Sequence, residues 1–171
     1  MNNLLLIPDK IGGLPTHPLI VHFVVILLPL AAIAFIGTGW KAEWRRQYSL
    51  AVALLAIGAL VAAFIATETG DMLKDRIRDA ARAAGTRADF GDHPDDGELA
   101  RNVAILFALV AAGFWAVVQW GEQLKLPSWA PMALYAIGSI VGVVAIITVI
   151  SAGHSGSALV WKDLGNFVKP K

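Results

Sequence analysis

This chain of 171 residues contains four histidines, and their side chains are its best candidates for binding a metal or transferring a proton. His22 stands about one turn inside the first long apolar stretch, and His17 lies just before that stretch. His93 follows a polar segment, and His154 ends the last apolar stretch. Imidazole is the commonest metal ligand in proteins. A titratable group inside a membrane span costs roughly 2 to 3 kcal/mol, so His22 marks a candidate functional site.

The elements that must position these histidines are apolar. The chain is 57% hydrophobic and only 16% charged, which is typical of a membrane protein. Four uncharged stretches account for this composition, at about residues 19–40, 48–67, 102–120 and 129–152. Each is close to the ~20 residues that a helix needs to cross a bilayer. Short connections between them predict an all-α fold, an integral membrane antiparallel four-helix bundle in one membrane domain, residues 1–171.

A polar segment, residues 68–97, separates the second and third spans. Its first half has apolar residues at helical spacing and two i,i+3 pairs of opposite charge, Asp75 with Arg78 and Asp79 with Arg82. Gly85 is well suited to end a helix. We therefore expect a short amphipathic helix on the membrane surface here, followed by an acidic turn, Phe90 to Glu98, that leads into the third span.

Chain order places all four histidines at one face of the bundle. In an up-down-up-down arrangement, the start of span one, the end of span two, the start of span three and the end of span four lie together. Ten of the 14 Lys and Arg residues fall on this face, and the positive-inside rule then places the histidine face in the cytoplasm.

His22 and His154 are the predicted ligand pair, because they lie at similar depth on different spans. Two imidazoles on facing helices suit the axial positions of a b-type haem, and Gly153 and Gly156 leave space for a flat ring. His17 is five residues before His22 and so points ~140° away from it on one helix.

The leading hypothesis is a haem b-binding membrane protein that transfers electrons. In that hypothesis His17, His93 and Glu68, a carboxylate at the end of span two, tune the pocket.

Other interpretations remain open. His22 can simply form a hydrogen bond between helices, and His93 can belong to a turn. His93 and His17, with the acidic residues of the turn, can instead form a non-haem site for zinc, copper or iron in a metal-binding or transport-related protein. A third possibility is a non-catalytic subunit that packs into a larger membrane complex through the Gly138 and Gly142 face of span four.

Composition excludes several classes of protein. The chain has no cysteine, so it holds no disulfide and no thiolate-bound cluster. A net charge of +1 argues against a nucleic-acid partner. We find no pairing of nucleophile and base and no phosphate-binding loop, which argues against a free-standing enzyme. The expected partners are the lipid bilayer and either a redox protein or a second copy of the chain.

Two motifs resemble a known family. Leu14 to Phe23 (LPTHPLIVHF) and Gly153 to Val160 (GHSGSALV), together with the acidic turn after His93, resemble the bacterial four-span membrane proteins of domain of unknown function 2231. The resemblance covers nearly the whole chain, although Val24 and Trp161 stand where the family often has proline and tyrosine. It implies a multi-pass protein of the bacterial inner membrane with His17, His22, His93 and His154 at the family's histidine positions. Some relatives are fused to Rieske-like or cytochrome-like domains, which implies a redox setting.

Overall fold

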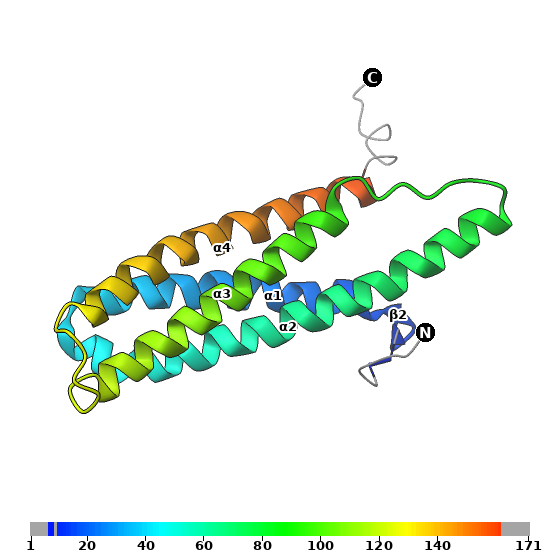
Figure 1. Ribbon diagram of the computed structural model, residues 1–171. Helices are drawn as coiled ribbons and strands as arrows, with labels where there is room; N and C mark the ends of the chain where they lie inside the picture. Colours follow the sequence, from blue (N-terminus) through cyan, green and yellow to red (C-terminus); the bar gives the residue numbers. More distant parts are fainter. Residues whose placement is uncertain (1–6, 9, 162–171) are drawn as a thin grey trace, which may run out of the picture.

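The computed structural model describes residues 7, 8 and 10–161. In this part of the chain four long helices lie side by side as an antiparallel bundle: α1 (Thr16–Gly37), α2 (Ala42–Ala83), α3 (His93–Trp120) and α4 (Ala130–Trp161) (Figure 1). All four are long and apolar enough to cross a membrane, which confirms the predicted all-α four-span fold. Lys162, Lys169 and Lys171, which contribute to the predicted orientation, lie outside the described residues.

A small β-hairpin precedes the first helix, where the sequence suggests only a loop. Strands β1 (Lys10–Ile11) and β2 (Leu14–Pro15) pair antiparallel, with Lys10 opposite Pro15. Gly12 and Gly13 join them with φ of +58° and +84°, values that glycine adopts without strain. Thr16 then starts α1 and donates a hydrogen bond of 2.6 Å to the Pro8 carbonyl oxygen. At the other end of α1 a 3-10 turn, η1 (Thr38–Trp40), leads into α2.

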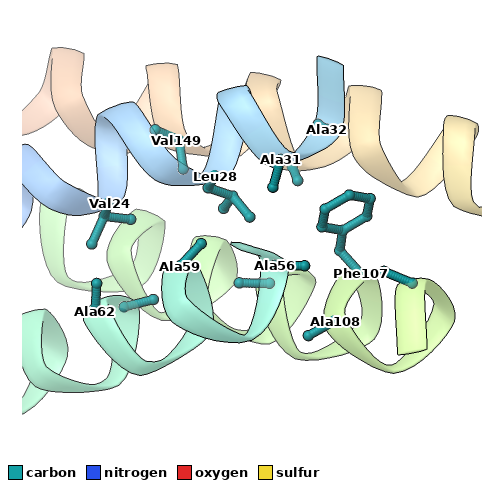
Figure 2. Close-up of a cluster of buried hydrophobic side chains, with 14 of the residues drawn as sticks. Val24, Leu28, Ala31, Ala32, Ala56, Ala59, Ala62, Phe107, Ala108 and Val149 are labelled. Atoms are coloured by element: carbon teal, nitrogen blue, oxygen red, sulfur yellow. The ribbon is translucent and has the colours of Figure 1, made fainter. Parts of the chain in front are cut away.

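The helices form a closed ring in which α1 packs on α2, α2 on α3, α3 on α4 and α4 on α1. Alanine dominates the interior, where it lets the helix backbones approach closely. Figure 2 shows part of this core, with Leu28 of α1, Ala56 and Ala59 of α2, and Phe107 of α3 meeting around one centre. Most of the larger aliphatic side chains are exposed on the outside of the bundle, as the lipid environment of a membrane allows, and Leu28 is the largest aliphatic side chain among the fully buried ones.

Helix α2 corrects one detail of the predicted architecture. Residues 68–83 are helical, but they continue span two without a break, and Figure 1 shows this part of α2 projecting past the bundle. The predicted ion pairs are present, with 3.8 Å between Arg78 and Asp75 and 3.4 Å between Arg82 and Asp79. Because no proline interrupts the segment, nothing separates it from the span. As predicted, the helix ends before Gly85, which has φ of +70°.

The predicted acidic turn is also shorter than expected, because α3 starts at His93. Pro94 occupies the first turn of the helix, where its missing N–H is no loss, and Asp95 and Asp96 lie where the positive end of the helix dipole favours acids. Helix α4 likewise runs to Trp161, well past the predicted end at residue 152. The ends of α3 and α4 near His93 therefore form helical walls where the sequence suggests a turn and a tail.

The Gly138 and Gly142 face of α4 lies inside the bundle. A Cβ atom at Gly138 would stand 2.3 Å from the Phe35 ring of α1, and one at Gly142 would stand 3.2 Å from the Ala32 side chain. Both glycines are buried. The prediction that this face binds an external partner is wrong, because α1 already occupies it.

Candidate functional site

His17 is held by the neighbouring helix. It is the second residue of α1, and its Nδ1 lies 2.8 Å from the backbone carbonyl oxygen of Ala66 on α2. A carbonyl oxygen can only accept a hydrogen bond, so Nδ1 carries the proton and donates it. The second ring nitrogen of a neutral imidazole, Nε2, then keeps its lone pair. This arrangement prepares a histidine to bind a metal through Nε2.

His93 is held in the same way in the other half of the bundle. It is the first residue of α3, and its Nδ1 lies 3.1 Å from the backbone carbonyl oxygen of Ala152 on α4. The Ser155 hydroxyl oxygen is also near, at 3.3 Å from Nδ1. The carbonyl again requires Nδ1 to be the donor, so Nε2 of His93 is also left as an acceptor.

These two histidines meet at the centre of the bundle end. Their ring centroids are 6.0 Å apart and their planes are inclined at 68°. All four helices take part, since α1 and α3 supply the imidazoles while α2 and α4 supply the carbonyl groups that orient them. The result is a pair of half-buried imidazoles whose orientation is set by backbone atoms.

The predicted pair, His22 and His154, is placed differently. The His22 side chain is exposed, and its Nδ1 lies 2.6 Å from the Pro18 carbonyl oxygen of its own helix. His154 is exposed on α4. No hydrogen bond or ring contact joins the two within the described residues. The angular argument from sequence separates His17 from His22 on α1, but it does not say which of them faces inward, and the structure turns His17 inward.

His154 lines an open pocket of about 680 Å³ beside the histidine pair. Its wall comes from the start of α3 and the end of α4 and includes His93, Asp96, Ser151 and Trp161. His93 therefore both lies near His17 and lines this pocket.

Of the supporting residues predicted from sequence, Gly156 contacts the histidine pair, and Gly153 and Glu68 do not. Gly156 lies directly against the His93 ring, whereas a Cβ atom on Gly153 would meet nothing within 4 Å. Glu68 is exposed on α2, two residues after the Ala66 carbonyl that holds His17. Within residues 10–161, no group of three or more His, Asp or Glu side chains is arranged to hold a metal ion. The acidic residues around His93 thus form no such cluster in the part that the structure describes.

The sequence contains a signal that identifies the central pair. His17 and His93 are both followed by proline, and each His-Pro dipeptide stands at the beginning of a helix. Proline favours the first turn of a helix, so the repeated dipeptide places two imidazoles at helix starts on the same face of the bundle. From the sequence we predict that His17, which points ~140° from His22, and His93 tune the pocket, with a turn as the alternative for His93, and neither prediction uses this repetition.

Together these features define a four-span membrane protein with a histidine pair at one end of its bundle. Residues 13–166 match the family described as "predicted membrane protein (DUF2231)", and the chain belongs to this family. No curated protein and no solved structure matches the chain.

Proposed function

We propose that this protein binds a b-type haem between His17 and His93 and transfers electrons through it in the membrane. The observation that carries the proposal is the pair of imidazoles whose Nδ1 atoms are both engaged by backbone carbonyls. Each neutral ring then keeps an unprotonated Nε2, as a metal ligand must, and the backbone hydrogen bonds make each ring a better ligand.

The spacing of the rings fits one metal between them. If both rings bound one metal ion through bonds of about 2 Å, their centroids would lie about 6 Å apart. The observed separation is 6.0 Å. Haem iron takes four ligands from its porphyrin and needs only two from the protein, the number that this pair supplies. Two protein ligands are fewer than the four of a structural zinc site, so the pair suits haem better.

Two protein ligands to one haem iron favour electron transfer over oxygen or substrate chemistry. If His17 and His93 both held the haem iron, the group would supply one-electron transfer and would leave no ligand position for oxygen or a substrate. His17 lies 23 residues from Trp40, about 35 Å along a helix, so the pair stands near the membrane boundary opposite Trp40. A redox partner can approach a centre at this depth.

The absorption spectrum of the purified protein tests the proposal. The chain is produced with haem synthesis supported, extracted in detergent, and measured oxidised and after dithionite. We expect a Soret band and a sharp α-band on reduction. A protein with neither band, or one that holds stoichiometric zinc, copper or iron without porphyrin, would contradict the proposal and support the non-haem alternative.

A further inference from the structure

The two halves of the bundle hold their histidines with the same set of residues. In the α1–α2 hairpin, His17-Pro18 starts one helix, and Ala66, Thr69 and Gly70 lie on the other. In the α3–α4 hairpin, His93-Pro94 starts one helix and Ala152, Ser155 and Gly156 lie on the other. Both hairpins thus combine a His-Pro start with an Ala-x-x-(Thr or Ser)-Gly motif.

The hydrogen bonds follow the same correspondence. The Ala66 carbonyl oxygen receives the His17 ring at 2.8 Å and the Thr69 hydroxyl at 3.1 Å. The Ala152 carbonyl oxygen receives the His93 ring at 3.1 Å and the Ser155 hydroxyl at 3.2 Å. Thr69 also donates a shorter hydrogen bond, of 2.7 Å, to the Ile65 carbonyl oxygen, so the shared feature of the two halves is a carbonyl that is contacted by the ring and lies next to a hydroxyl.

The glycines complete the correspondence, because each imidazole lies against one. A Cβ atom at Gly70 would stand 3.0 Å from Nδ1 and from Cε1 of His17. A Cβ atom at Gly156 would stand 2.7 Å from Cε1 of His93 and 3.2 Å from its Nε2. These distances are shorter than van der Waals contact, so each ring occupies the space that any larger residue would fill.

We infer that Gly70 and Gly156 are the positioning residues of the histidine pair, one in each of two equivalent helical hairpins. The missing side chain lets each imidazole lie close to the backbone of the neighbouring helix, within reach of the carbonyl that orients it. Each hairpin is then a complete histidine-holding unit, and the two units present their rings to each other across the bundle. This inference rests on the proposed function only for the identity of what the rings bind.

Alanine substitutions of the glycines test the inference, with Gly153→Ala as the matched control. Gly153 lies on α4 between Ala152 and His154, and its Cβ would meet nothing within 4 Å. The first readout needs no haem. Selective ¹⁵N-histidine labelling gives signals from only four residues, and Nδ1–H and Nε2–H forms are distinguishable by NMR. We expect Gly70→Ala to shift the His17 signals and Gly156→Ala to shift the His93 signals, with neither moved by Gly153→Ala.

The second readout is haem affinity, measured by titrating haem into the apoprotein. Loss of an orienting contact to a metal ligand weakens metal binding about 10-fold or more, and we expect this of both glycine variants. Thermal unfolding and circular dichroism check the fold. If Gly156→Ala does not fold, Gly70→Ala alone tests the positioning role, because its added Cβ would stand 3.0 Å from the His17 ring instead of 2.7 Å from the His93 ring.

The outcomes separate the two proposals. Glycine variants that match Gly153→Ala in histidine signals and in haem affinity overturn the positioning role. If the wild-type protein binds no haem while the histidine signals shift as expected, the proposed function fails and the positioning role stands.

Discussion

At the scale of single residues, the direction of an imidazole is decided by the backbone atom that it meets. Sequence reasoning identified the four histidines and the angle between His17 and His22. It did not identify which pair meets, because it did not use the repeated His-Pro starts or the Ala-x-x-(Thr or Ser)-Gly repeat that contains the Ala66 and Ala152 carbonyls. The two conspicuous motifs contain both inward and exposed residues, since His17 shares one with the exposed His22 and Gly156 shares the other with the exposed His154.

Tyr135 offers a residue-scale prediction at the opposite end of the bundle. Its hydroxyl donates a hydrogen bond of 2.8 Å to the Ile36 carbonyl oxygen near the end of α1. Tyr135→Phe removes this bond and keeps the ring stacked on Phe35, so we expect a loss of about 1 kcal/mol in the free energy of unfolding. Thermal unfolding in detergent measures the change. Tyr48→Phe is the control, since that side chain is exposed, and an equal loss there would contradict the assignment.

At the scale of helices, four uncharged apolar stretches of suitable length predicted four spans, and the structure has four helices long and apolar enough to cross a membrane. The ends of the helices were less predictable because they depend on tertiary contacts. Helix α4 continues past residue 152 where Gly156 packs against His93, and α2 continues past residue 67 with ion pairs on its surface. On α2 the apolar pattern stops where charges begin, but the helix continues past that point.

The contact between α1 and α4 gives the element-scale prediction. Gly138→Ala places a Cβ atom 2.3 Å from the Phe35 ring, which is itself packed against Phe107 and Phe114. Forcing an extra methyl group into such a core costs about 1 to 3 kcal/mol, and we expect a lower unfolding temperature. Gly58→Ala is the control, because its Cβ would face open space on α2. A Gly138→Ala variant as stable as Gly58→Ala would contradict this packing.

At the scale of the whole molecule, the arrangement of charges predicts how the bundle lies in the membrane. The histidine face has more Lys and Arg than the opposite face, where the exposed Trp40, Trp120 and Trp129 are typical of a membrane boundary. Chain order alone predicted that the four histidines share a face. It could not predict the pair, because residues at one face of a bundle still point in different directions.

Single-cysteine variants test the orientation, since the chain has no cysteine of its own. Asp79→Cys lies on the extension of α2 and Glu122→Cys on the α3–α4 connection at the other end, and both positions are exposed. The experiment uses spheroplasts and a membrane-impermeant maleimide. If the histidine face lies in the cytoplasm, the reagent labels Glu122→Cys in intact spheroplasts and labels Asp79→Cys only after lysis. The reverse pattern places the histidine face outside.

The central claim is that His17 and His93, and not the two exposed histidines, form the binding site. Its most direct test is the haem content per chain of four alanine variants prepared side by side, two at the central pair and two at His22 and His154. The account predicts that His17→Ala and His93→Ala lose the bound haem while His22→Ala and His154→Ala keep it at the wild-type level. Loss of haem from His22→Ala and His154→Ala, with retention in the other two, would contradict the account and restore the pair predicted from sequence.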